Sequence, residues 1–158
     1  MELRELPDPT AAPGELLVRT LSIGICGTDF ELLAGQHGVA PDGEQHLVIG
    51  HESLAEVIQA PHGSGFKVGD LAVGVVRRPD PVPCRSCAAG EWDMCQNGLY
   101  TERGIKGRHG FASDLFTLEE RFAVHVPAQL RGTGVLREPA SVVAKAWEQI
   151  EHVCKRLV

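Results

Sequence analysis

The sequence has no surplus of positive charge. Its formal net charge at pH 7 is -6, from 15 Lys and Arg against 21 Asp and Glu. The densest basic stretches are "VRR" at 76–78 and "CKR" at 154–156, and we expect both to be solvated or to make only local contacts. Because a nucleic-acid interface needs clustered Lys and Arg to neutralise phosphates, we expect no nucleic-acid partner.

The sequence also lacks a long apolar run. No segment approaches the roughly 20 consecutive apolar residues of a membrane span. The first residues, "MELRELPDP", do not contain the apolar centre of a signal peptide. These absences predict a cytoplasmic location and no membrane partner.

Evenly paired cysteines are missing as well. The five cysteines form an odd and unevenly spaced set: Cys26, Cys84, Cys87, Cys95 and Cys154. In a protein expected in the cytoplasm, such a set favours free thiols or metal ligands over a framework of disulfides.

What the sequence does contain indicates one mainly β domain. The length of 158 residues suits a single domain, and an apolar content of 43% is enough for a packed core. The 18 glycines and 10 prolines separate short apolar runs, as in all-β domains. We expect a short helix over 28–35, a loop rich in Pro and Cys over 79–100, and strands over 14–26, 51–60, 69–78, 110–118 and 122–127.

The C-terminal segment has a different pattern and predicts a helix over 139–157. Pro139 lies near its first position, and one apolar face follows at spacings of 3 and 4 residues: Val143, Trp147, Ile150, Cys154 and Leu157. No Gly or Asn cap ends this helix. An apolar stripe of this kind needs a partner surface, and a homo-oligomer formed through the helix would provide one.

A first group of candidate metal ligands is scattered along the chain. It consists of Cys26 in "GICGTD", His51 and Glu52 in "GHE", and Glu138 in "LREPAS". Thiolate, imidazole and carboxylate are the usual zinc ligands, and a divalent cation would compensate a carboxylate among apolar residues. Two alternatives remain open at this point, because the Cys can be a core residue and the His–Glu pair can simply form a hydrogen bond.

A second group is compact. Cys84, Cys87 and Cys95 lie in "PVPCRSCAAGEWDMC", a CxxC motif with a third cysteine eight residues later. CxxC is typical of a structural zinc site or of a redox pair, and the β-rich surroundings favour zinc. A closed structural site has four ligands, and Asp80 is a candidate for the fourth.

Seven motifs in order carry a resemblance to a known family. They are "GICGTD", "GHE", "VGD", "VRRP", "CRSCAAGEWDMC", "YTERGIKGRHGF" and "EPASVVAKA". Together they resemble the catalytic domain of zinc-dependent medium-chain dehydrogenases, and within these the glucose 1-dehydrogenase branch. The resemblance runs from about residue 13 to the end of the chain. It implies a GroES-like, partly open β-barrel with short helices and a C-terminal helix.

The resemblance also implies roles for individual residues. Cys26, His51 and Glu138 match the ligands of the catalytic zinc, and Glu52 matches a neighbouring carboxylate that can exchange with water. Thr28 matches the hydroxyl that relays the proton of the alcohol. Zinc lowers the pKa of a bound hydroxyl, which makes this proton transfer feasible.

The implied substrate is a sugar. Glu102 in "YTERG" matches a ligand of sugar hydroxyls, and Glu138 is a second expected substrate contact. The implied reaction is oxidation of an aldose at its anomeric hydroxyl, with hydride transfer to NAD or NADP. One alternative is another polyol or alcohol, such as sorbitol or threonine. Another is a free-standing zinc-binding or interaction module without activity.

The sequence departs from the family in two respects. Pro81 stands where the family usually has a cysteine three residues before Cys84, so a complete structural zinc site depends on Asp80. No Gly-rich dinucleotide fingerprint follows any expected strand, and "RGTGVL" at 131–136 lacks the third glycine and a following helix.

These departures define the expected domain organisation. Residues 1–138 would form the catalytic domain with a metal-binding lobe at 79–100, and the helix at 139–158 would lead into a nucleotide-binding domain absent from this sequence. NAD or NADP is therefore expected only in a longer protein, and the 158 residues alone are expected to lack hydride transfer.

Overall fold

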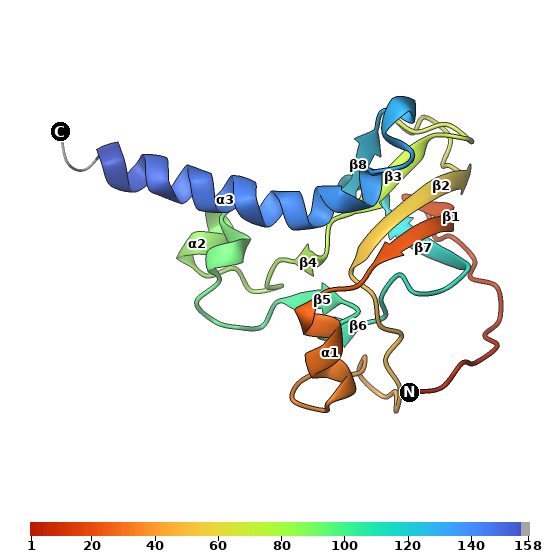
Figure 1. The fold of residues 1–158 in the computed structure, drawn as a ribbon, viewed down its shortest axis with the longest axis horizontal. Helices are drawn as coiled ribbons and strands as arrows, with labels where there is room; N and C mark the ends of the chain where they lie inside the picture. Colours follow the sequence, from red (N-terminus) through yellow and green to blue (C-terminus); the bar gives the residue numbers. More distant parts are fainter. Residues whose placement is uncertain (156–158) are drawn as a thin grey trace.

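The main sheet of the protein is antiparallel and has five strands. The structure is a computed structural model that describes residues 1–155 (Figure 1). The strands lie in the order β7-β1-β2-β3-β8. Their bounds are Glu15–Gly24 (β1), Glu52–Gln59 (β2), Leu71–Gly74 (β3), Leu115–Glu119 (β7) and Ala123–Val126 (β8). Within the described residues, no helix has both the length and the apolar character needed to cross a membrane.

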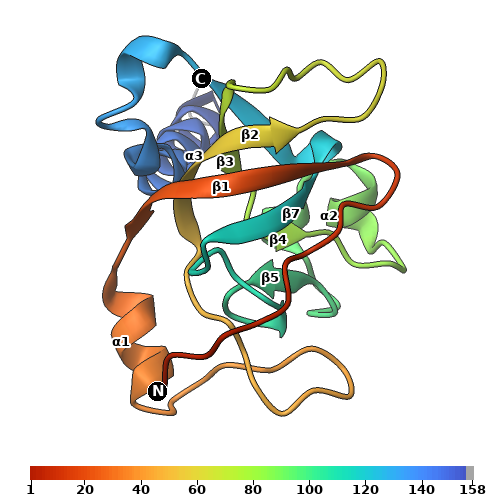
Figure 2. The same cartoon turned by 90° about the vertical axis from the view of Figure 1, so that its right-hand side faces the viewer.

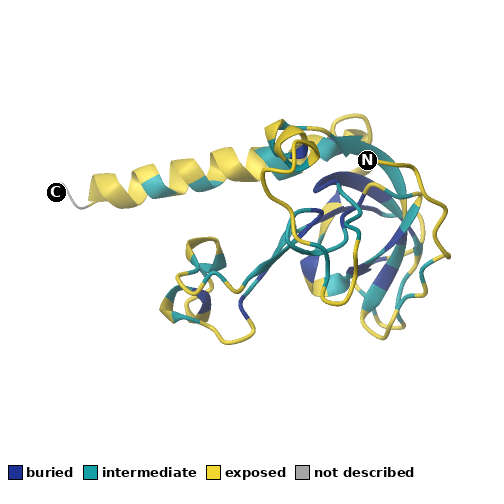
Figure 3. Cartoon of the chain, turned by 90° about the horizontal axis from the view of Figure 1, so that it is seen from below, coloured by how far each residue is buried: buried dark blue, intermediate teal, exposed yellow. Residues whose placement is uncertain are grey.

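The core lies within the curl of this sheet, where the buried residues gather (Figure 3). The central strand β2 is covered on both faces. Ala55 and Val57 belong to a large cluster that includes Phe111, whereas Leu54 packs into a second cluster with Val126. Burial on both faces explains why the strand begins with a nearly continuous run of buried residues instead of alternating.

A second, smaller sheet lies beside the first. It contains β4 (Arg77–Arg78), β5 (Thr101–Arg103) and β6 (Gly107–Arg108). We use the name cysteine lobe for residues 79–100, which carry helix α2 (Arg85–Ala88) and the 3-10 turn η1 (Trp92–Met94). Figure 2 shows the two sheets with α2 at their side.

Three arginines tie the small sheet to strand β7. Arg78, Arg103 and Arg108 all donate to the carboxylate of Glu119. Burial alone would raise the pKa of Glu119, but hydrogen bonds from Arg78 and the charges of Arg78 and Arg103 lower it to about 2. The expectation that "VRR" is solvated or makes only local contacts is therefore wrong for Arg78, which is only 4% exposed and binds Glu119, 41 residues away.

The helices lie outside the sheets. Helix α1 (Gly27–Leu33) follows β1, and the longest helix, α3 (Arg137–Cys154), extends away from the main sheet (Figure 1). The 3-10 turns η2 (Glu120–Phe122), η3 (Ala128–Leu130) and η4 (Gly134–Leu136) complete the described elements.

The expected mainly β fold with a C-terminal helix is confirmed, but several boundaries differ. The strand expected over 69–78 is divided between the two sheets, and the short strands β5 and β6 were not predicted. Helix α3 begins at Arg137 and directly follows "RGTGVL", so the expectation that no helix follows this segment is wrong. The segment nevertheless follows a 3-10 turn and not a strand, as a dinucleotide fingerprint would require. Leu157 of the predicted stripe lies outside the described residues.

Candidate metal centre and adjoining cavity

Cys26 lies at the start of helix α1, directly after strand β1. Its backbone N–H donates to Asp29 Oδ2 over 2.9 Å, which holds the first turn of the helix. Asp29 is a buried carboxylate, 3% exposed, and sequence reasoning missed it. The available signal was its place three residues after Cys26, where an acidic residue usually caps the helix. The Asp29 carboxylate also lies beside His51.

His51 immediately precedes strand β2 and is 5% exposed. Its Nε2 lies 3.2 Å from Cys26 Sγ, and its Nδ1 lies 3.6 Å from Asp29 Oδ1. No hydrogen bond to Nδ1 is formed within residues 1–155. A carboxylate behind a histidine is the usual arrangement that orients an imidazole toward a metal.

Close backbone packing fixes the position of His51. A Cβ atom on Gly104 would lie 2.4 Å from the carbonyl oxygen of Gly50, and one on Gly110 would lie 2.3 Å from it. Both positions therefore require glycine. Phe111 also donates its N–H to the Gly50 carbonyl over 2.8 Å, so the residue before His51 is held on several sides.

Glu52 and Glu138 bring further negative charge to this region. Glu52 is 7% exposed and lies over Gly24, where an added Cβ would come within 2.0 Å of Glu52 Oε2. Glu138 lies in the first turn of α3, within electrostatic reach of His51 and Glu52. Burial raises its pKa, and the charge of Glu52 raises it further, while His51 opposes the shift. The structure thus brings all four expected ligands to one region, although neither Glu52 nor Glu138 is part of the tight Cys26–Asp29–His51 group.

These residues fit a zinc ion. A thiolate and an imidazole on tetrahedral zinc lie about 3.6 Å apart, so Cys26 and His51 would need to separate by only a few tenths of an ångström. Within the described chain, no Lys or Arg pairs with Asp29, Glu52 or Glu138. Buried carboxylates without a positive partner are costly, and a divalent cation would offset that cost.

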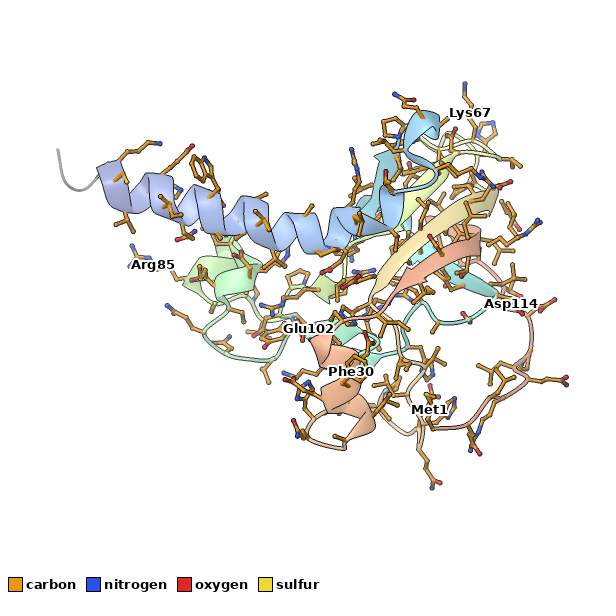
Figure 4. The ribbon with its side chains drawn as sticks, in the orientation of Figure 1. Met1, Phe30, Lys67, Arg85, Glu102 and Asp114 are labelled. Carbon is orange, nitrogen blue, oxygen red and sulfur yellow. The ribbon has the colours of Figure 1, made fainter. Side chains whose placement is uncertain are left out.

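A cavity of about 400 Å³ lies beside helix α1. It brings Thr28 and Glu102 together, although they are far apart in the sequence; Figure 4 labels Glu102 near the helix. The cavity is lined by Thr28, Glu31, His37, Gly38, Val39, Glu102, Ile105 and Lys106. Its mixture of carboxylate, hydroxyl, imidazole and ammonium groups suits a ligand that both donates and accepts hydrogen bonds.

The cysteine lobe forms a second candidate centre. The sulfur atoms of Cys84, Cys87 and Cys95 lie within 4.8 Å of one another. Hydrogen bonds led by the Gln96 N–H lower the pKa of Cys84 to about 6, whereas burial raises that of Cys87 to about 11.

Asp80 lies beside these cysteines and is only 4% exposed. Its Oδ1 accepts the Val82 N–H, and its Oδ2 lies 3.9 Å from Cys95 Sγ. Three sulfurs and a buried carboxylate are a donor set that zinc accepts.

A third group, Glu44, His46 and His109, was not predicted and does not fit a metal. His109 Nδ1 accepts the Val48 N–H over 3.1 Å, so the proton of the neutral ring must sit on Nε2. That Nε2 lies 2.9 Å from Glu44 Oε2 and donates to it. With its lone pair unavailable, His109 serves as a clamp on the loop that leads to His51.

Comparisons with known proteins agree with the resemblance seen in the sequence. Residues 12–128 match the family described as "Alcohol dehydrogenase GroES-like domain". The chain is 44% identical over 151 residues to a glucose 1-dehydrogenase of Methanocella arvoryzae, covering 95% of this chain and 42% of that protein. It is 43% identical over 149 residues to a glucose 1-dehydrogenase of Thermoproteus tenax, covering 94% and 41%.

A solved structure is similar in fold. It is the glucose dehydrogenase of Haloferax mediterranei in complex with NADP, Zn and gluconolactone, with a TM-score of 0.83 and 42% identity. The match covers 92% of this chain and 41% of that one, so the chain spans about two-fifths of the length of its relatives. The family match over most of the chain, together with the fold, shows that this protein belongs to the alcohol dehydrogenase GroES-like domain family of medium-chain dehydrogenases.

Proposed function

We propose that this chain is the metal-binding and substrate-binding part of a zinc-dependent dehydrogenase that oxidises glucose or a related aldose. The observation that carries the proposal is the Cys26–His51 contact of 3.2 Å, backed by the buried Asp29 carboxylate and joined by Glu52 and Glu138. The relatives named glucose 1-dehydrogenase favour a sugar, and NAD or NADP would be bound outside these 158 residues.

In this proposal Cys26, His51 and Glu138 hold the zinc, with Glu52 as a neighbouring carboxylate. The metal, when bound, supplies a Lewis acid that lowers the pKa of a substrate hydroxyl. Asp29 keeps the imidazole of His51 oriented, and Glu52, which is buried beside the ligands, offers a further carboxylate to the metal.

The cavity supplies the remaining functions. Thr28 offers a hydroxyl that accepts the proton of the sugar and passes it toward solvent, because it is partly exposed on the cavity wall. Glu102 accepts a hydrogen bond from a second sugar hydroxyl. Two contacts on one substrate fix the orientation of the carbon that loses hydride.

The cysteine lobe has a structural role in this proposal. Cys84, Cys87 and Cys95 give three ligands of a closed zinc site, and Asp80, whose Oδ2 lies 3.9 Å from Cys95 Sγ, would move in as the fourth ligand that Pro81 cannot provide. A filled site would hold the short elements α2 and η1, which are too small to be stable by themselves.

Metal analysis tests the two centres. We expect two zinc ions per chain by elemental analysis, one after Cys26→Ser, and two after the control Cys154→Ser, because Cys154 is exposed and belongs to neither group. Cobalt substitution would add visible absorption bands typical of thiolate ligation, and Cys26→Ser should remove only one set. Loss of zinc in the control to the same degree, or full retention in Cys26→Ser, would contradict the assignment.

Ligand titration tests the substrate class. NMR titration of the zinc-loaded chain with D-glucose, sorbitol and threonine should shift the amides of Thr28 and Glu102 most with glucose. A preference for sorbitol or threonine would favour the alternative alcohol substrates. No shift with any of the three would favour a zinc-binding module without substrate.

A further inference from the structure

Arg77 makes three kinds of contact at the edge of the small sheet. Its Nε and Nη2 donate to Glu102 over 3.0 and 2.8 Å, and its Nη1 donates to the carbonyl oxygen of Asp93 over 3.0 Å. Its guanidinium also lies over the Tyr100 ring, 4.0 Å from the centroid. Such a residue is fully engaged and does not act as a solvated surface charge.

The contact with Glu102 has an uncommon geometry. An arginine fork usually engages both oxygens of a carboxylate. Here both nitrogens donate to the same oxygen, Oε1, and no hydrogen bond to Oε2 is found among the described residues. Glu102 lines the cavity together with Thr28, and its side chain is 16% exposed, so Oε2 is left as an acceptor for a ligand there.

The Asp93 contact extends this arrangement into the cysteine lobe. Asp93 lies in η1, two residues before Cys95, and its own carboxylate lies 3.3 Å from Lys145 Nζ on helix α3. A shift of the lobe would therefore move the carbonyl that holds Arg77, and with it Glu102.

We propose that Arg77 is a positioning residue, which keeps Glu102 as a single-oxygen acceptor for a substrate hydroxyl and couples that acceptor to the cysteine lobe. This proposal rests on the proposed function of the cavity as a sugar site. Arg77 acts through Glu102 and does not itself touch the substrate. The site then selects ligands that can place one hydroxyl donor at Oε2 of Glu102. Because Arg77 fixes the orientation of that carboxylate, Arg77 is a determinant of specificity.

A double-mutant cycle tests whether Arg77 acts through Glu102. Binding of D-glucose to the zinc-loaded chain is measured by NMR titration for Arg77→Met, Glu102→Gln and the double variant. We expect Arg77→Met to weaken binding about tenfold, since a misplaced charged acceptor loses a hydrogen bond of that size. In the Glu102→Gln background, Arg77→Met should cause no further loss. The proposal would be overturned if the double variant lost affinity by the product of the two single losses, or if Arg77→Met bound D-glucose as the unaltered chain does.

Two further variants separate a positioning role from a general loss of structure. Arg77→Lys keeps the charge but not the fork, so it should recover part of the affinity. Arg85→Met is the matched control, because Arg85 is exposed and lies in α2 of the same lobe, and it should bind as the unaltered chain does. Should Arg77→Met fail to fold, Arg77→Lys still decides, since wild-type affinity in that variant would contradict the need for the fork.

Amide hydrogen exchange without any ligand tests the coupling separately. Arg77→Met should speed exchange at residues 92–95 and 101–103, and Arg85→Met should not. If the unaltered chain binds no sugar while this exchange effect is seen, the proposed function fails and the coupling through Arg77 stands. If sugar binds normally and exchange is unchanged in Arg77→Met, the coupling fails and the proposed function stands.

Discussion

Replacing Gly104 by alanine should disturb the metal centre through the backbone. Gly104 has φ of +73°, and an added Cβ would lie 2.4, 2.8 and 2.9 Å from the O, C and N atoms of Gly50. The left-handed conformation costs about 1 kcal/mol for alanine, and a backbone clash in a packed region adds about 2 kcal/mol. We therefore expect Gly104→Ala to lower the free energy of unfolding by about 3 kcal/mol.

The clash has a second consequence, because Gly50 directly precedes His51. Relief of the clash must move Gly50, and this changes the distances from His51 to Cys26 and to Asp29. We therefore expect Gly104→Ala to bind zinc more weakly, in addition to being less stable. Gly63→Ala is the matched control, since Gly63 has φ of +79° but no atom within 4 Å of the added Cβ. It should lose only about 1 kcal/mol and keep its zinc affinity.

Urea unfolding of the metal-free chains and zinc competition with a chelator provide the two measurements. Equal losses of stability in Gly104→Ala and Gly63→Ala, or zinc binding by Gly104→Ala as tight as that of the unaltered chain, would contradict this prediction.

Three further predictions concern other regions. Since the folded pKa of Glu119 is about 2, below its ordinary 4.5, its contribution is present above pH 4.5 and is lost as pH falls toward 2. Glu119→Gln should therefore cost about 1–2 kcal/mol at pH 7 in urea unfolding, after allowance for solvent screening, and little at pH 2, whereas the exposed Glu5→Gln should show no such dependence. Asp80→Asn should lower the zinc content by one ion per chain in elemental analysis, and an unchanged content would exclude Asp80 as a ligand. Trp147 is 64% exposed in the apolar stripe of α3, so Trp147→Glu should reduce any concentration-dependent self-association in sedimentation velocity; equal association in both proteins would exclude this surface as the contact.

Local patterns predicted the elements better than they predicted contacts between them. The strand after "GHE" and the helix after Cys26 are confirmed, because glycine, proline and apolar spacing act over a few residues. The Cys26–His51 contact joins residues 25 positions apart; their residue types made them candidate ligands, and the resemblance to a family is what favoured a shared site. Asp29 was missed because a carboxylate in the first turn of a helix is usually a cap.

Charged residues were the hardest to interpret from sequence. "VRR" indicates a solvated stretch by composition alone, yet Arg78 is buried against Glu119 and Arg77 is engaged with Glu102. Their partners lie 41 and 25 residues away, and a pattern of single residues carries no information on such pairs. The strands β5 and β6 escaped prediction for a related reason, since strands of two or three residues are too short to show alternation.

Helix α3 turns its polar face toward the rest of the protein and leaves its apolar face exposed, unlike a typical surface helix. Glu138 and Lys145 are seven residues apart and therefore share one face, and Lys145 pairs with Glu91 over 2.6 Å and with Asp93 over 3.3 Å. A polar face thus holds the outer part of the helix to the cysteine lobe, while at the start of the helix Arg137 donates to the carbonyl oxygen of His125 over 3.0 Å. The apolar face, with Trp147 and Ile150, points the other way and is more than half exposed. Because a surface helix usually buries its apolar face, this inversion indicates that ion pairs with the cysteine lobe, and not apolar packing, hold the outer part of α3. The outer part of α3 and the cysteine lobe are therefore expected to lose their order together when those pairs are removed.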